Sequence, residues 1–430
     1  MQPATASLEA TGLRLTGYRW RICALLFAAI SINYVDRSVL GVLAPDLQHR
    51  IGWNEIQYSN IVNAFQAAYA IGLLLAGRFM DRVGVRLGFA TSIGVWSVAT
   101  IATALVSTVL GFGIARAMLG LGESGGFPAA IKTVAEWFPK KERALATGLF
   151  NCGTNVGAIL APLAVPWLAV RYGWQSAFVV LGVLSALWIV PWLMMYRRPQ
   201  NHPRVTAAEL AYIQADPPDP EGRIPWAHLI RYRQTWAFLI AKSMTDPIWW
   251  FFLFWLPKFL NTQYGLSITA IGWPLVIIYN MATLGSIFGG WLPARLFKLG
   301  WNANRSRKTA MLICAITVTP IMFAANVRHL WTAVTLIGLA TASHQGWSAN
   351  LFTLPSDMFP RRAVGSVTGI GGFGGGLGGM AIATFTGFVL QFTGSYVPMF
   401  VIAGSVYLVA LLMVHLLAPR LEPAQLEIAA

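Results

Sequence analysis

The sequence predicts an all-α membrane protein whose twelve transmembrane helices form two similar six-helix halves. Three observations lead to this prediction: the composition, a series of apolar runs and an internal repeat. Of the 430 residues, 56% are hydrophobic and only 11% are charged, and the mean hydropathy is +0.58. Because soluble proteins carry about a quarter of charged residues, this composition indicates a polytopic membrane protein.

Apolar runs of about 20 residues are long enough to cross a bilayer as helices. Twelve such runs are present, at residues 20–44, 57–77, 87–107, 110–134, 144–170, 174–196, 236–260, 268–296, 308–326, 329–355, 363–390 and 395–417. Because the number of spans is even, both ends of the chain are expected on the same side of the membrane.

The positions of lysine and arginine indicate which side that is. The connectors on the side of the termini contain 24 of the 31 basic residues, the opposite connectors contain four, and three lie within spans. Loops rich in Lys and Arg stay on the cytoplasmic side, so both termini are expected in the cytoplasm. The net charge of +15 is thereby explained by topology, and we expect no binding of nucleic acid.

An internal repeat divides the chain into halves. Residues 138–148 align without gaps with residues 359–369, and three glycines repeat at the same offset of 221 residues: Gly153 with Gly374, Gly157 with Gly378, and Gly173 with Gly394. Two similar halves in the same orientation imply a pseudo-twofold axis along the membrane normal, with a binding site between the halves near the midplane.

These boundaries predict five segments. They are a cytoplasmic tail at 1–19, an N-terminal six-helix bundle at 20–196, a cytoplasmic linker at 197–235, a C-terminal six-helix bundle at 236–417 and a cytoplasmic tail at 418–430. The linker is rich in proline, which favours a tether with one short amphipathic helix over a third domain.

Six formally charged side chains lie within spans: Asp36, Arg37, Arg116, Glu123, Lys242 and Asp246. One ionised side chain at the centre of a span costs roughly 2.5–3.5 kcal/mol, so each must face water, an opposite charge or a ligand. Arg116 and Glu123 are seven residues apart, which places them on one face of a helix. The alternative is three ion pairs that only hold helices together, Asp36 with Arg37 or Arg116 among them. We favour function for the first four residues, and the roles of Lys242 and Asp246 stay open.

The types of these residues suggest a chemistry. A guanidinium offers a carboxylate two parallel N–H donors and a permanent charge, so Arg37 and Arg116 are the expected contacts for an anionic substrate. Asp36 and Glu123 are the groups that can gain and lose a proton. We expect their protonation to free the arginines for an incoming anion, after which the loaded halves rock towards the cytoplasm.

Neutral polar side chains would contact the rest of such a substrate. The candidates are Tyr34, Tyr69, Asn151, Thr154, Asn155, His344, Gln345, Ser348 and Asn350. A hydrogen bond between helices is an equally good explanation for any one of them. Trp249, Trp250 and Trp255 either shape the pocket or anchor the protein at the membrane interface.

The connector between the second and third spans carries a recognisable motif. Residues 77–86 read G-x-x-x-D-R-x-G-x-R and resemble the loop that marks the major facilitator superfamily, whereas the counterpart at 290–295 lacks the aspartate. The resemblance implies the major facilitator fold and a gating role for Gly77, Asp81, Arg82, Gly84 and Arg86. Topology alone would explain the arginines but not Asp81 or Gly84.

Within that superfamily the chain is similar to the anion:cation symporters. The similarity rests on residues 33–37, on Arg116 with Glu123, on residues 136–143 and on residues 246–257, and His344-Gln345 with residues 356–359 most resemble hexuronate transporters. The resemblance implies proton-coupled uptake of a sugar acid in a bacterial inner membrane, with Glu123 as the coupling residue and both arginines as substrate contacts.

Other functions are considered beside this one. An uncoupled facilitator, or a carrier of another carboxylate such as an aromatic acid or an aldonate, stays open. An enzyme is not expected, because the chain has no H-E-x-x-H or G-x-S-x-G motif, and no sensor domain fits in the connectors. The three cysteines lie within apolar runs and fit no metal motif, so we expect no metal or cofactor. The expected partners are a small organic anion, protons and the lipid bilayer, and we expect a monomer.

Overall fold

The computed structural model describes residues 17–215, 226–422 and 424. Within these residues the chain forms helices and no strand, as the all-α prediction requires. Residues 1–16 of the predicted N-terminal tail, 216–225 of the predicted linker, and 423 and 425–430 of the predicted C-terminal tail lie outside the described part.

The helices cover the twelve predicted spans, one of which consists of two α-helices. In chain order they are α2 (Tyr18–Ile51), α3 (Glu55–Val83), α4 (Val85–Thr103), α5 (Val109–Glu123), α6 (Gly126–Trp137), α7 (Lys140–Tyr172), α8 (Trp174–Met195), α11 (Arg233–Tyr264), α12 (Gly272–Lys298), α13 (Ala303–Val318) with the 3₁₀ helix η2 (Thr319–Asn326), α14 (Leu330–Leu351), α16 (Arg361–Thr393) and α17 (Val397–Leu417). Nine of the described segments are long and apolar enough to cross a membrane. The other three predicted spans correspond to α5 with α6, to α11 and to α14.

The apolar run at 110–134 is not one continuous helix, contrary to the prediction. Helix α5 ends at Glu123 and α6 begins at Gly126, and the Ser124 hydroxyl donates to the carbonyl of Leu121 at 2.7 Å. The glycines that weaken this helix are required by its neighbours. A Cβ on Gly120 would lie 2.4 Å from the carbonyl oxygen of Phe65, and one on Gly122 would lie 2.6 Å from the backbone nitrogen of Trp96. These two glycines therefore let α5 pack closely against α3 and α4.

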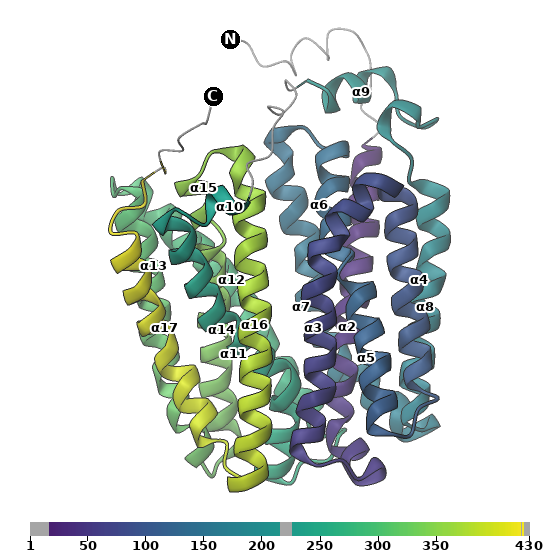
Figure 1. Cartoon of the computed structure of the whole chain (residues 1–430), viewed down its shortest axis with the longest axis vertical. Coiled ribbons are helices and arrows are strands. Elements are labelled where there is room, and N and C mark those ends of the chain that lie inside the picture. Colours follow the sequence, from purple (N-terminus) through teal and green to yellow (C-terminus); the bar gives the residue numbers. More distant parts are fainter. Residues whose placement is uncertain (1–16, 216–225, 423, 425–430) are drawn as a thin grey trace.

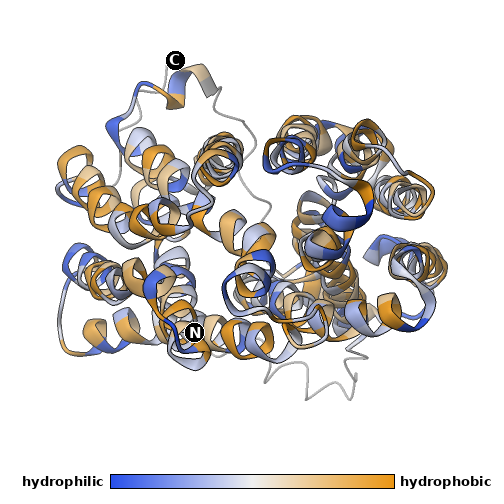
Figure 2. Cartoon of the chain, turned by 90° about the horizontal axis from the view of Figure 1, so that it is seen from below, coloured by the Kyte–Doolittle hydropathy of each residue, from blue (hydrophilic) through white to orange (hydrophobic). Residues whose placement is uncertain are grey.

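The helices form two groups that lie side by side (Figures 1 and 2). In the first group α2 packs on α7, α3 on α5, and α4 on α8; in the second, α12 packs on α14, and α11 on α16 and α17. The groups meet where α3 contacts α16, α7 contacts α12 and α2 contacts α11. The first group corresponds to the predicted N-terminal bundle and the second to the C-terminal bundle.

Both described ends of the chain lie at the same end of the molecule, at the top of Figure 1, which we call the termini end. The short connector helices α9 (Ala207–Ile213), α10 (Trp226–Leu229) and α15 (Leu354–Met358) lie at this end as well. The other end is called the opposite end.

Part of the predicted tether is a docked element. The carboxylate of Glu209 on α9 is fully buried; it pairs with the Arg19 guanidinium at 3.2 Å and accepts the backbone N–H of Tyr18 at 3.4 Å, which places a negative charge at the N-terminus of α2. His202 packs on Tyr18 with 4.3 Å between ring centroids, and burial lowers the pKa of His202, so its ring is neutral near pH 7. The linker up to α9 is thus fixed to the first group of helices.

Candidate functional site

A buried ion pair joins α2 to α5 in the middle of the first group. The Arg37 guanidinium donates from Nε and Nη2 to Oε2 of Glu123, at 2.9 and 2.7 Å. Arg37 is 3% exposed and Glu123 is 1% exposed. Burial of two charges is favourable only when both are paired and hydrogen-bonded, so neither side chain can be removed without leaving the other uncompensated.

Arg116 lies next to this pair, on the same helix as Glu123. Its Nη2 donates to the backbone carbonyl of Arg37 at 3.2 Å, while its Nε is buried without a partner among the described residues. Oε1 of Glu123 is also buried and has no hydrogen-bond partner among the described residues. Arg116 and Glu123 both reach Arg37, so the face of α5 that the sequence assigned to them is the face turned towards α2.

Asp36 points to another helix than Arg37 does. Its Oδ2 accepts the hydroxyl of Ser185 on α8 at 2.8 Å, and its Oδ1 is buried without a partner among the described residues. The alternative in which Asp36 forms an ion pair with Arg37 or Arg116 is not what the structure contains. Neighbouring residues on a helix project about 100° apart, which carries the two side chains to different neighbours.

Aromatic rings enclose the Arg37 guanidinium. Its Cζ lies 4.8 Å from the ring centroids of Tyr34 and Tyr69, 5.3 Å from that of Trp250 and 5.4 Å from that of Phe65. Cations at such distances from a ring are attracted by its electrons. Trp250 belongs to α11, so this cluster, the Arg37 site, is completed by the second group of helices.

Two further polar side chains at this site were not among the predicted contacts. The amide oxygen of Asn33 accepts from Nη2 of Arg37 at 3.4 Å. Gln66 is 2% exposed, and neither polar atom of its side chain has a partner among the described residues. A Cβ on Gly379 would lie 2.4 Å from Oε1 of Gln66 and 2.9 Å from Cδ1 of Trp250, so this amide is held between the two groups of helices.

Gln66 could have been noticed in the sequence as a polar residue one position after Phe65 in an apolar span. Asn33 could have been noticed because it precedes Arg37 by one helical turn. Their partners could not have been predicted, since those belong to other helices.

The candidates in α14 belong to the second group of helices. His344 stacks on Trp249 at 5.4 Å between ring centroids, and its Nδ1 is hydrogen-bonded to the hydroxyl of Tyr407 at 2.6 Å. Nδ2 of Asn350 donates to the carbonyls of Gly289 and Gly346 at 2.8 and 2.9 Å, so this amide holds α14 against α12. Gln345 and Ser348 are partly exposed on α14.

On α7, the hydroxyl of Thr154 donates to the carbonyl of Asn151 at 2.8 Å, within the helix. Asn155 is partly exposed and Asn151 is exposed. The geometry therefore leaves the two asparagines with more freedom to meet a ligand than Thr154.

Lys242 and Asp246 form their own ion pair on α11, with Nζ 2.6 Å from Oδ2. The Lys242 ammonium also lies 3.9 Å from the ring centroid of Phe352. A Cβ on Gly375 would lie 2.5 Å from Oδ2 of Asp246, so α16 packs directly on this carboxylate. The sequence left the roles of these two residues open, and the structure shows that they pair with each other.

Polar contacts close the two groups against each other at the opposite end. Lys258 of α11 pairs with Glu55 of α3, and the Tyr58 hydroxyl donates to the carbonyl of Phe254 at 2.8 Å. The amide Nδ2 of Asn63 also donates to the hydroxyl of Thr384 at 2.7 Å. These contacts lie between the Arg37 site and the opposite end, and they hold the two groups of helices together there.

The predicted gating loop joins α3 to α4 at the termini end. Gly84 has φ +82°, a conformation suited to glycine, which ends α3 and starts α4. Asp81 pairs with Lys132 of α6, and the backbone carbonyl of Arg86 accepts from Nε1 of Trp192 of α8 at 2.9 Å. Gly77 has open space around it, and Arg82 is exposed. The loop is therefore bound to helices of its own group.

The comparisons with known proteins agree with this architecture. Residues 26–383 match the model of the Major Facilitator Superfamily. The chain is 31% identical over 423 residues to the hexuronate transporter of Escherichia coli (strain K12), covering 96% of this chain and 97% of that protein. It is 32% identical over 311 residues to the galacturonate transporter of Dickeya chrysanthemi, and the match covers 70% of this chain and 90% of that protein.

A solved structure shows the same fold. It is the inward-facing, occupied form of a bacterial homolog to the human lysosomal transporter Spinster, with a TM-score of 0.68 and 18% identity, covering 94% of this chain and 96% of that one. The fold class inferred from the sequence is confirmed. The chain belongs to the major facilitator superfamily of membrane transporters and is a multi-pass membrane protein.

Proposed function

We propose that this protein takes up a hexuronate or a related sugar acid together with protons, by alternating access, across a bacterial inner membrane. The named relatives carry hexuronate, galacturonate and D-galactonate, which are sugar acids. The observation that supports the proposal most is the Arg37 site, in which a buried guanidinium is bound to a protonatable carboxylate and enclosed by aromatic rings.

In this proposal the substrate carboxylate replaces Glu123 at Arg37. Protonation of Glu123 removes its charge, and the freed N–H donors of Arg37 then bind the incoming anion. The exchange keeps the guanidinium paired throughout, which is the condition for keeping a charge buried in a membrane. Asp36 is the second protonation site, because its Oδ1 is buried without a partner among the described residues.

The sugar ring would lie against Tyr34, Tyr69 and Trp250, whose side chains are partly exposed. Gln66 would bind a hydroxyl group, since the polar atoms of its buried side chain have no partner among the described residues. Asn33, whose amide oxygen accepts from Arg37, would be a neighbouring contact. Arg116 completes the positive side of the site. Asn155, Gln345 and Ser348 remain candidates for outer contacts, and Thr154, His344 and Asn350 are weaker ones because their polar atoms already bind the protein.

The orientation follows from charge. We place the termini end in the cytoplasm, because most loop arginines and lysines lie on that side. The opposite end, where polar contacts hold the two groups of helices together, is then periplasmic. Asp81, Arg82, Gly84 and Arg86 would hold the cytoplasmic ends of the helices when the protein opens outward.

The proposal is tested with Glu123→Gln in proteoliposomes. Glutamine keeps a hydrogen-bonding side chain but cannot carry a proton, so proton-driven uptake of labelled galacturonate should be lost while exchange against internal galacturonate continues. Lys242→Met combined with Asp246→Asn removes both charges of the ion pair in the second group of helices without leaving one unpaired. This double variant serves as the matched control and should keep proton-driven uptake. Unchanged proton-driven uptake by Glu123→Gln would exclude Glu123 as the coupling residue.

An uncoupled facilitator of the same substrates is the main alternative. It would equilibrate galacturonate at the same rate with and without an imposed pH gradient, whereas a symporter accumulates it only with the gradient. A panel that includes glucuronate, an aldonate and an aromatic acid distinguishes the substrate classes in the same assay.

A further inference from the structure

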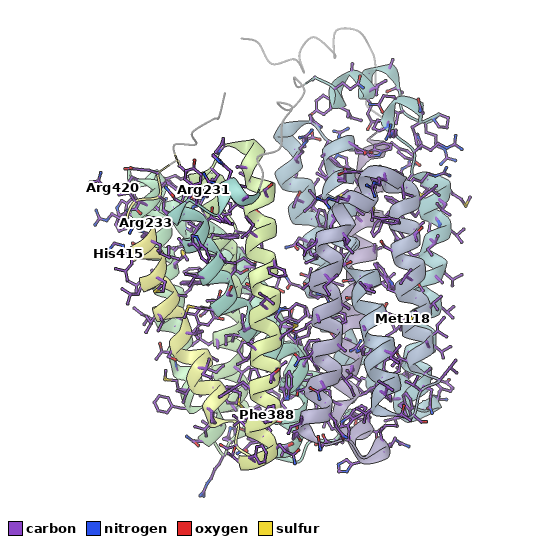
Figure 3. The ribbon with its side chains drawn as sticks, in the orientation of Figure 1. Met118, Arg231, Arg233, Phe388, His415 and Arg420 are labelled. Atoms are coloured by element: carbon purple, nitrogen blue, oxygen red, sulfur yellow. The ribbon has the colours of Figure 1, made fainter. Side chains whose placement is uncertain are left out.

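A cavity of about 510 Å³ lies between α13 and α17, which contribute nothing to the Arg37 site. Its lining includes Asn302, Arg305, Lys308, Leu312, Leu411 and His415. Figure 3 shows His415 on the outer side of α17 near the termini end, with Arg420 beyond it. Pockets of roughly 300–1,000 Å³ are of the size that holds small ligands.

Exposed apolar side chains surround the cavity on α13 and α17. Leu312 is 42% exposed on α13, and Leu412 and Leu416, which flank the exposed His415 on α17, are 55% and 57% exposed. Apolar side chains exposed on the outside of a membrane-spanning helix face acyl chains. Because α17 ends at Leu417, His415 lies within the last turn of the helix, at the depth of the lipid headgroups.

The cavity is positively charged. The Arg305 guanidinium lies 4.0 Å from the ring centroid of Trp301 and forms no ion pair with any described residue. Nζ of Lys308 donates to the carbonyls of Ala418 and Pro419, both at 2.7 Å, and is hydrogen-bonded to Nδ1 of His415 at 3.3 Å. These bonds fix the ammonium in the wall of the cavity but do not neutralise it.

The neighbouring Arg307 is different, because its Nε donates to Oδ2 of Asp357 at 2.9 Å. None of the described residues that line the cavity is acidic. The ion-paired Arg307 and the unpaired Arg305 therefore lie two residues apart. Of the two, only Arg305 lines the cavity, and its N–H donors are available to a ligand.

We propose that this cavity binds the phosphodiester headgroup of an anionic phospholipid from the leaflet at the termini end. The phosphate would contact Arg305 and the charged wall at Lys308, and one acyl chain would lie along Leu312 and Leu411. Basic pockets between transmembrane helices recognise anionic headgroups in this way, and a tryptophan such as Trp301 suits the same depth. A lipid fits better than a free phosphate, which would gain nothing from the leucines.

The test uses the purified full-length protein in neutral detergent with added phosphatidylglycerol or phosphatidylcholine. Native mass spectrometry measures the retained lipid, and thermal unfolding measures stabilisation. Phosphatidylglycerol should be retained and should raise the unfolding temperature, whereas phosphatidylcholine should do neither. Arg305→Gln should weaken phosphatidylglycerol binding by about fivefold, the contribution typical of one basic residue at an anionic surface.

Arg420→Gln is the matched control, because Arg420 lies at the same end, is highly exposed and does not line the cavity. It should bind phosphatidylglycerol like the unaltered protein. Equal binding of phosphatidylcholine, or an equal loss in both variants, would overturn the proposal. Stabilisation by glycerol 3-phosphate alone would also overturn it, since the site would then serve a soluble phosphoester.

Discussion

The two groups of helices repeat in sequence, but their buried charges are arranged differently. In the first group the charges come from different helices, and Arg37 of α2 pairs with Glu123 of α5 at 2.7 Å. In the second group Lys242 and Asp246 lie four residues apart on one helix and pair with each other at 2.6 Å. The carboxylate of Glu123 is fully buried, whereas the Asp246 side chain is 23% exposed.

The two clusters also differ in whether their buried polar atoms have hydrogen-bond partners. Oδ1 of Asp36, Oε1 of Glu123 and Nε of Arg116 are buried without partners among the described residues, whereas no polar atom of Lys242 or Asp246 is in this condition. Buried polar atoms without partners are costly and are satisfied by a ligand, water or a proton. The first cluster thus has capacity for exchange, and the second is a closed local pair.

The largest effect is expected at Arg37. Arg37→Gln should lower galacturonate uptake by about 100-fold or more, because the substrate loses its charged contact. It should also destabilise the protein by about 3–5 kcal/mol, because Glu123 remains buried and unpaired. Adding Glu123→Gln should restore thermal stability but not uptake. Recovery of uptake in the double variant would show that the pair only holds α2 and α5 together.

A smaller effect is expected from Trp250, the ring that the second group of helices contributes to the Arg37 site. Trp250→Ala should raise the KM for galacturonate by about fivefold, in the range of one cation–π contact, with less change in maximal rate. Trp250→Phe should retain most of the affinity. Initial uptake rates measured against substrate concentration test this, and an unchanged KM in Trp250→Ala would separate the second group from substrate binding.

The Lys242–Asp246 pair should affect galacturonate uptake less still. Lys242→Met with Asp246→Asn removes both charges together, so no uncompensated charge is left and uptake should stay within about threefold of the unaltered protein. Each single substitution should cost more than the double one. Loss of transport in the double variant would contradict this contrast and would make the Lys242–Asp246 pair part of the transport mechanism.

The smallest effect is expected at the gating loop, which the second half lacks in full form. Asp81 and Lys132 are about one-third exposed, and pairs at such positions contribute about 0–1 kcal/mol. Asp81→Asn should therefore change the unfolding temperature little. If the loop holds the outward-open form, the same variant should change the rate of uptake without changing the KM, as measured by initial rates.

The sequence by itself determined the spans, the six-plus-six division and the charged residues that lie within the membrane. These features depend on the length and hydropathy of each segment, which decide whether that segment can cross a bilayer. The predicted spans therefore agree in position with the helices observed. The pairing of Lys242 with Asp246 also lies within reach of the sequence, because residues four apart share a helix face.

Only the tertiary structure decided which partner each remaining charge has. Asp36 meets Ser185 of α8, Arg37 meets Glu123 of α5 and Trp250 of α11, and Gln66 lies against Gly379 of α16. The rotation of each helix about its axis and its distance from its neighbours fix these contacts, and both depend on packing across the whole bundle.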